Sequence, residues 1–154
     1  MSEDGPSTPP RRPQSVLFAC GQNVIRSPMA EAIARYYFGA STFVASAGVR
    51  TGDPDPFVQT ALEEIGMSLG RHRPHSFEEL AELEGLNFDL IVTLAPEAHH
   101  KALELTRTLA TDVEYWPTPD PSFAIGNREQ KLDAYRQLRD GLVSRICERL
   151  GMKP

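Results

Sequence analysis

Short apolar runs and helical patterns alternate along this chain, and this alternation restricts the fold more than any other feature. The runs span residues 15–20, 42–46, 88–94 and 112–116, and the third is apolar enough to be covered on both faces of a sheet. Strands that alternate with helices form parallel sheets with helices on both sides. At 154 residues the chain has room for one domain of ordinary size. The sequence therefore predicts a single α/β domain.

Apolar residues at spacings of three and four mark the helices between and after these runs. Asp55 followed by Pro56 is a typical helix start, and the segment 76–79 has the form of a capping box. We expect helices over about 28–38, 56–65, 77–84, 96–110 and 128–150. The fourth of these places Leu109 on its inward face, with Ala98, Ala102 and Leu105.

Residues 1–14 differ from the rest of the chain. They are rich in Pro, Ser and Thr and hold no large apolar residue after Met1, so they have little to contribute to a core. We predict a disordered tail over 1–14 and a folded domain over 15–154.

Charge and cysteine content exclude several classes of protein. A formal net charge of -5 and a pI near 5.4 disfavour a nucleic-acid binder, which would need a basic face. Cys20 and Cys147 are too few for a disulfide framework. No stretch approaches the roughly 18 apolar residues of a membrane span, and the apolar run at 16–20 is shorter than the core of a signal peptide. We expect a cytoplasmic protein with neither nucleic-acid nor membrane partners.

The turn after the first predicted strand carries the strongest chemical pattern. Ligands of parallel α/β sheets bind beyond the carboxyl ends of the strands, where Cys20 falls. Five residues separate Cys20 from Arg26, and a loop of this length can wrap its backbone N–H groups around one tetrahedral oxyanion. The next helix adds its positive end, and Arg26 can grip two oxygens with its planar guanidinium. We expect phosphate to be bound by Gly21, Gln22, Asn23, Val24, Ile25, Arg26 and Ser27.

Within this cradle Cys20 is the candidate nucleophile, since positive charge and amide dipoles stabilise a thiolate. Ser27 is placed to donate a hydrogen bond to that thiolate, to cap the helix, or both. Taken singly, Cys20 is better explained by a buried strand position, and Arg26 by a solvated helix start. Their order and spacing favour catalysis, and no glycine-rich loop of the GxxxxGK[ST] or GxGxxG type competes with them.

The segment 16–32, VLFACGQNVIRSPMAEA, resembles the opening of the low-molecular-weight protein tyrosine phosphatase family, whose pattern is Cys-x5-Arg-Ser/Thr, usually continued by Pro-Met-Ala-Glu. The resemblance extends over nearly all of the chain beyond the tail. It implies a four-stranded parallel sheet in the order 2-1-3-4 and a covalent phosphocysteine intermediate on Cys20. It also implies that Asp120, which precedes Pro121, is the general acid, although on local sequence alone Asp120 is as typical of a turn.

The resemblance further implies supporting roles for Ser46 at the end of the second strand and for His72, in a network with Asn23 and Ser27. The four histidines lack a HExxH or CxxC partner motif, so we expect no metal, and the mechanism requires no cofactor. Cys147 is expected to pack within the last helix. Trp116 belongs either to the core or to the edge of the pocket.

Several departures from the family pattern concern the substrate. Gly21 stands where leucine is common, the loop 49–53 lacks an aromatic residue, and Ser122-Phe123 replaces an aromatic pair. A phosphotyrosine ring needs apolar walls, so the phosphatase assignment is stronger than the tyrosine assignment.

Three functions therefore remain open. The first is a phosphomonoester hydrolase that acts on protein phosphotyrosine or a small phosphomonoester and releases inorganic phosphate. The second is an arsenate reductase on the same scaffold, although 93–100 holds none of the cysteines that a thiol relay would need. The third is an oxyanion-binding regulatory module without turnover.

Overall fold

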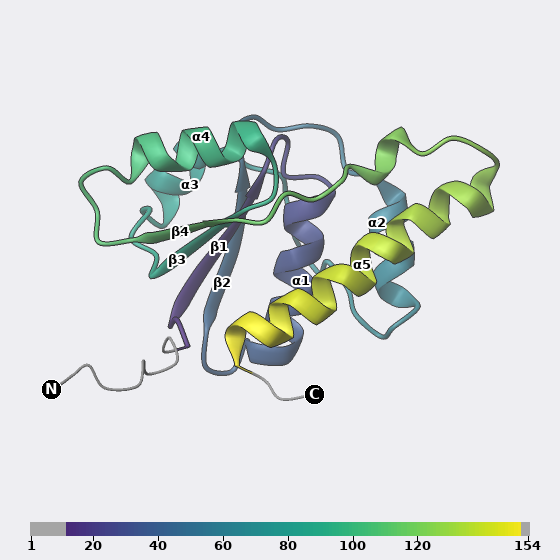
Figure 1. Cartoon of the computed structure of the whole chain (residues 1–154), viewed down its shortest axis with the longest axis horizontal. Helices are drawn as coiled ribbons and strands as arrows, with labels where there is room; N and C mark the ends of the chain where they lie inside the picture. Colours follow the sequence, from purple (N-terminus) through teal and green to yellow (C-terminus); the bar gives the residue numbers. More distant parts are fainter. Residues whose placement is uncertain (1–11, 152–154) are drawn as a thin grey trace, which may run out of the picture.

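The computed structural model describes residues 12–151 as a four-stranded sheet between two layers of helices (Figure 1). All neighbouring strands are parallel, in the order β2-β1-β3-β4, which confirms the predicted fold class and strand order. The elements in chain order are β1 (Ser15–Cys20), α1 (Arg26–Phe38), β2 (Phe43–Gly48), α2 (Pro56–Glu63), α3 (Phe77–Leu83), β3 (Leu90–Thr93), α4 (Pro96–Leu105), β4 (Asp112–Tyr115), the 3-10 turn η1 (Pro121–Phe123) and α5 (Arg128–Leu150).

Alternation along the central strand β1 divides the core into two layers. Val16, Phe18 and Cys20 face the layer formed with α1, α2 and α5. Leu17 and Ala19 face the layer formed with α3 and α4. Since β1 lies inside the sheet and is covered on both sides, its apolar residues are almost fully buried. Cys20 is the last residue of this strand, so the following turn emerges at the carboxyl edge of the sheet.

The bounds of several elements differ from the prediction, most clearly in α4, β2 and β3. The helix predicted over 96–110 ends at Leu105, because the capping residue Thr106 leaves helical backbone geometry (φ -105°, ψ 11°), and its N–H and hydroxyl both bond to the carbonyl of Ala102. Leu109, predicted to face inward, is 37% exposed. The second strand extends to Gly48 because it pairs with all six residues of β1. The third strand pairs only over Leu90–Thr93.

Residues 1–11 of the predicted tail lie outside the described part of the chain. Residues 12–14 contact the domain: the Arg12 side chain donates to the carbonyl of Leu150 at 2.8 Å, and the Gln14 carbonyl accepts from the amide of Phe43. The end of α5 therefore lies beside the amino ends of β1 and β2. Between residues 12 and 151, no helix is long and apolar enough to cross a membrane.

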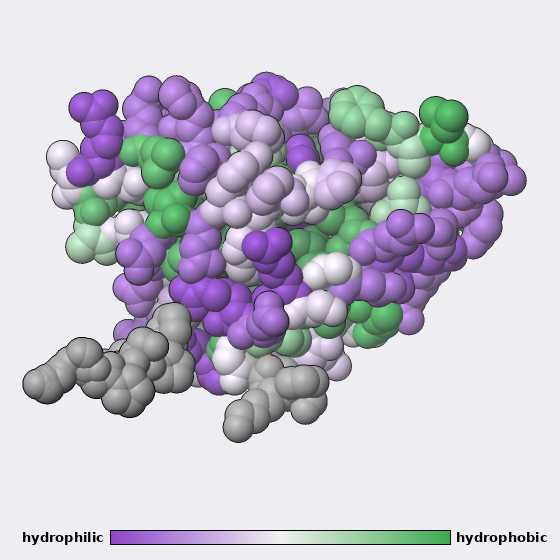
Figure 2. Space-filling view, in the orientation of Figure 1, coloured by the Kyte–Doolittle hydropathy of each residue, from purple (hydrophilic) through white to green (hydrophobic). Residues whose placement is uncertain are grey.

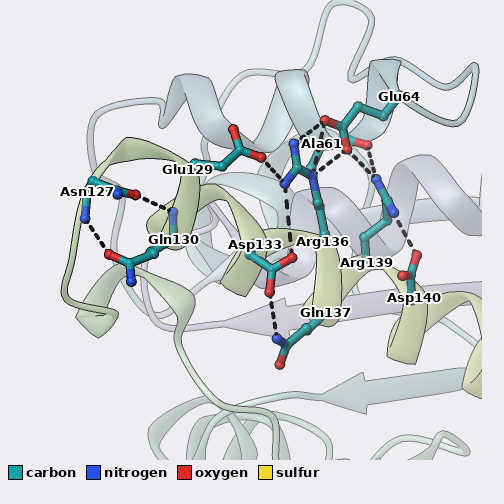
Figure 3. A network of polar contacts seen from close by, with 10 residues as sticks. All are labelled: Ala61, Glu64, Asn127, Glu129, Gln130, Asp133, Arg136, Gln137, Arg139 and Asp140. Carbon is teal, nitrogen blue, oxygen red and sulfur yellow. Dashed lines mark hydrogen bonds and ion pairs between the residues drawn. The ribbon is translucent and has the colours of Figure 1, made fainter.

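An ion network fastens α2 to α5 on the outer side of the first layer (Figure 3). Its centre is Glu64, whose carboxylate accepts from Arg136 at 2.8 Å and from Arg139 at 2.9 Å. Arg139 is 8% exposed and also donates to the carbonyl of Ala61. Hydrogen bonds from Arg136, and further ones from Arg139, lower the pKa of Glu64 to about 2.

This depressed pKa predicts a pH dependence of stability. A carboxylate with a lower pKa in the folded state contributes stability that is present above its unfolded pKa of about 4.3, and that is lost as the pH falls toward its folded pKa. We expect Glu64→Gln to lower the free energy of unfolding at pH 7 and to lose less stability than the wild type between pH 5 and 3. Urea unfolding across this range measures both effects. Glu148→Gln, at an exposed position of α5, should keep the wild-type slope; parallel slopes for Glu64→Gln and wild type would contradict the prediction.

Candidate active site

The loop from Cys20 to Arg26 folds back over the end of the sheet. Cys20 is 3% exposed, and its Sγ lies 2.9 Å from Oγ of Ser27. The loop lies very close to β2. A Cβ on Gly48 would stand 2.5 Å from the backbone carbonyl oxygen of Arg50 and 2.8 Å from the backbone nitrogen of Asn23. Glycine is therefore required at the end of β2. The first turn of α1 follows the loop directly, so its free N–H groups and positive end face the same space.

Asn23 fixes the conformation of the loop. Its φ of 60° is left-handed, a region that asparagine tolerates better than most residues. The side chain is fully buried, and its amide nitrogen donates to Oγ of Ser27 and Oγ of Ser46, each at 2.9 Å. Its amide oxygen accepts from the backbone N–H of His75 at 3.0 Å. One side chain thus connects the loop, β2 and the segment before α3.

Behind Asn23 lies a buried carboxylate, Glu31 of α1. The hydroxyl of Ser46 donates to Glu31, whose Oε1 is 3.3 Å from Nδ1 of His72. The other ring nitrogen of His72 contacts the backbone oxygen of Asn23 at 3.2 Å. Burial by itself would raise the pKa of Glu31, but the hydrogen bonds from His72 and Ser46 and the charge of Arg35 hold that pKa below its usual value. The network gives the loop a rigid, charged support.

Arg26 and Asp120 face each other across the pocket. Arg26 donates to the carbonyl of Thr118 at 2.8 Å, and its other terminal nitrogen lies 4.0 Å from Oδ2 of Asp120. Oδ1 of Asp120 accepts from the amide and the hydroxyl of Ser122, at 2.9 and 2.7 Å. Because these bonds hold one carboxylate oxygen, the other is presented to the pocket.

Most of the predicted site residues line one cavity of about 690 Å³ at the carboxyl edge of the sheet: Cys20, Gly21, Gln22, Val24, Ile25, Arg26 and Asp120. The others, Asn23, Ser27, Ser46 and His72, do not line it and instead bond to one another behind the loop. Its outer wall holds an ion pair between Arg50 and Glu97, 2.9 Å apart. A Cβ on Gly21 would stand 2.5 Å from Oε1 of Glu97, so this carboxylate occupies the space that a side chain at position 21 would take. Across the pocket lies Phe123, which is 82% exposed.

Sequence reasoning missed three contributors to the site. Glu31 stands within the resembling segment but reads as an ordinary helix residue, and Arg50 and Glu97 lie in separate segments that only the fold brings together. Ser27 does not cap α1, whose N-cap is Ile25 without a side-chain bond. Trp116 is buried and contacts Phe18 edge to face, and it lines a second hollow rather than this pocket. Within residues 12–151, no three His, Cys, Asp or Glu side chains gather as a metal site would require.

The chain matches the family model of the low molecular weight phosphotyrosine protein phosphatase over residues 15–148. This match spans the whole sheet and both helical layers. The chain belongs to this family.

Proteins similar to this chain are named for different activities. An arsenate reductase of Bacillus subtilis (strain 168) is 30% identical over 134 residues, which are 86% of this chain and 92% of that protein. The tyrosine phosphatase AmsI of Erwinia amylovora has the same fold, with a TM-score of 0.72 and 18% identity over 90% of this chain and 91% of its own. YwlE arginine phosphatase, known from Bacillus subtilis, was solved as a cysteine-to-serine mutant with a phosphorylated active-site serine; its TM-score is 0.68 at 25% identity, over 88% of this chain and 91% of that chain.

Proposed function

We propose that the protein is a phosphoric monoester hydrolase that works through a phosphocysteine on Cys20. The observation that carries the proposal is the convergence of Cys20, Arg26 and Asp120 on one pocket that is also lined by residues of the loop between Cys20 and Arg26. A buried cysteine alone would be equally consistent with a purely structural role. The opposed guanidinium and carboxylate add the two functions that phosphoryl transfer needs, charge stabilisation and proton transfer. The phosphorylated active-site serine of the YwlE mutant supports a covalent route on this scaffold.

In the first step the Cys20 thiolate attacks phosphorus in line with the leaving oxygen. The S–P bond forms as the P–O bond to the leaving group breaks, and protonated Asp120 gives its proton to the departing oxygen. The loop amides and Arg26 hold the three equatorial oxygens. The hydroxyl of Ser27, 2.9 Å from the sulfur, is placed to stabilise the thiolate before attack and as it departs.

In the second step water attacks the phosphorus of the phosphocysteine. Asp120, now a carboxylate, accepts the proton of the water, the S–P bond breaks, and inorganic phosphate leaves. The Cys20 thiolate and protonated Asp120 are thereby restored. The positive charge comes from the loop and Arg26, so no metal enters any step.

The nucleophile is tested with Cys20→Ser, which should abolish hydrolysis of p-nitrophenyl phosphate while keeping the fold and phosphate binding. Cys147→Ser is the matched control and should retain nearly full turnover, because Cys147 lies in the last turns of α5, beside the amino ends of the strands. Steady-state assays with thermal unfolding in phosphate measure activity, fold and binding together. Equal loss in the two variants would refute a special role for Cys20.

The acid is tested with Asp120→Asn, whose effect should depend on the leaving group. We expect a loss of about 10²–10⁴ in kcat for phenyl phosphate, the usual contribution of general acid catalysis. p-Nitrophenyl phosphate should lose less in this step, because its leaving group departs without a proton. A series of aryl phosphates measured against leaving-group pKa gives the comparison. If the defect has the same size across the series, Asp120 is not the acid.

Arsenate reduction is the alternative that the named relatives favour. Arsenate is also a tetrahedral oxyanion, so the same loop would bind it, but its reduction to arsenite consumes two electrons from thiols. The sequence offers one other cysteine, and Cys147 lies at the opposite end of the sheet from Cys20. An internal disulfide therefore has no nearby partner, and reduction would need an external thiol. Assays with arsenate and thioredoxin or glutathione distinguish the two functions.

The outer wall favours a polar leaving group over an apolar one. The carboxylate of Glu97 has one oxygen on Arg50, and its other oxygen faces the space beside Gly21. The ring of Phe123 is exposed across the pocket. A guanidinium group stacks on an aromatic face and donates to a carboxylate. Phosphoarginine is thus a second candidate substrate, in keeping with the name of YwlE arginine phosphatase. For this substrate the P–N bond would break as the S–P bond forms, and Asp120 would give its proton to the departing guanidine nitrogen instead of an oxygen.

This candidate predicts a selective effect of Glu97→Gln. We expect kcat/KM for a phosphoarginine peptide to fall about tenfold, the loss of one charge-assisted hydrogen bond. The value for p-nitrophenyl phosphate should change less than about threefold, since no cation is present in its leaving group. Glu78→Gln, which breaks an exposed ion pair with Lys101 away from the pocket, should affect neither substrate. Equal losses on both substrates in Glu97→Gln would show that Glu97 does not contact the leaving group.

A further inference from the structure

A second hollow lies behind the loop that carries Asp120. It has a volume of about 520 Å³ and is formed between the segment 116–121 and the face of α5 from Ala134 to Arg145. Figure 2 shows hydrophobic surface at this place, between the loop and α5 in the middle of the view. Three prolines form one side, and the side chains of Leu138 and Leu142 form the other. We call this hollow the loop–α5 groove.

The groove has the size and composition of a small-molecule site. Such sites measure about 300–1,000 Å³ and combine apolar walls with a few polar groups. A protein interface would need about 800 Å² of surface on each partner, well beyond a hollow formed by one loop and one helix face. Gly141, in the middle of α5, leaves the groove open, because a Cβ there would meet nothing within 4 Å. Glycine in a helix interior costs roughly 0.5–1 kcal/mol relative to alanine, and no close contact in the fold requires it here.

Thr118, Asp120 and Gln137 are polar residues of the groove lining, and Arg145 is its one cation. Its guanidinium carbon lies 4.9 Å from the centre of the Trp116 ring. Within residues 12–151, Arg145 has no carboxylate within ion-pair distance, unlike Arg149 one turn later, which binds Glu114. The indole N–H of Trp116 is itself bonded to Glu114 at 3.2 Å, so the ring is fixed beneath the cation. The groove thus ends in an exposed guanidinium that is held over the Trp116 ring and is open to an anion.

We propose that the loop–α5 groove binds an aromatic carboxylate of one or two rings. The ring would lie between the prolines and the leucines, and the carboxylate would pair with Arg145, whose planar fork matches it. Asp120 lines both this groove and the active pocket, so the bound molecule would contact the back of the loop that carries the proposed acid. The site is separate from the anion loop and does not depend on the proposed reaction.

The test is a titration of the full chain with 1-naphthoate in saturating phosphate, which occupies the anion loop. Trp116 is the only tryptophan, so its indole N–H gives a single reporter signal in a ¹H–¹⁵N NMR spectrum. We expect a saturable shift of that signal. Arg145→Gln should weaken binding at least about tenfold, and the uncharged 1-naphthamide should bind the wild type more weakly by a similar factor.

Two further variants make the result specific to the groove. Gly141→Phe puts a ring into the open space beside α5 and should abolish the shift while the melting temperature stays near that of the wild type. Arg107→Gln removes the same charge from an exposed position outside the groove and should bind 1-naphthoate like the wild type. The proposal is overturned if no saturable shift occurs, if phosphate abolishes binding, or if Arg145→Gln and Gly141→Phe bind as the wild type does.

Discussion

The proposed anion site depends on one constraint: a loop of five residues must keep its backbone N–H groups directed at one centre. Such a loop needs a left-handed residue, and here that residue is Asn23, with φ 60°. The polar atoms that this conformation buries must be paired, because an unpaired buried group costs about 1–3 kcal/mol. Asn23 therefore bonds to Ser27, Ser46 and the backbone of His75, and the carboxylate of Glu31 completes the network. The end of β2, the first helix and the segment before α3 are shaped by these contacts, which explains why small residues end β2.

Much of this arrangement could be predicted from local patterns. The alternation of strands and helices, and the position of Cys20 at the end of the central strand, follow from apolar periodicity, which burial imposes directly. The network behind Asn23 could be expected only in part, since Glu31 has no local feature that marks it as buried and paired. The Arg50–Glu97 pair could not be expected at all, because the two residues meet through the packing of α4 against β1. Leu109 was predicted to face inward because the apolar periodicity continues past Leu105, where the backbone leaves helical geometry at Thr106.

Arg26 joins the two halves of the proposed chemistry. One terminal nitrogen holds the Thr118 carbonyl of the acid loop, while the guanidinium has further donors for an anion. An oxyanion can therefore bind without displacing Arg26 from the loop. Since Thr118 and Asp120 belong to one short Pro-rich segment, the contact also sets the distance between the proposed acid and the phosphoryl position. A lysine at position 26 would supply the charge, but it lacks the planar fork that can serve both partners at once.

The positions of the two cysteines determine which of the two reactions, hydrolysis or reduction, this chain could repeat over many turnovers without an external thiol. Hydrolysis returns Cys20 to a thiolate at the end of each cycle, so a single cysteine at the carboxyl edge of the sheet is sufficient. Reduction of an oxyanion leaves sulfur oxidised, and the enzyme must then be restored by a thiol that reaches the same pocket. Cys147 lies near the end of α5, where Arg12 binds the Leu150 carbonyl beside the amino ends of the strands. It reaches Cys20 only if α5 leaves the sheet, which would expose Tyr135, Leu142 and Ile146. The fold thus supports hydrolysis with its own residues, whereas a reductase on this chain would depend on a thiol from outside.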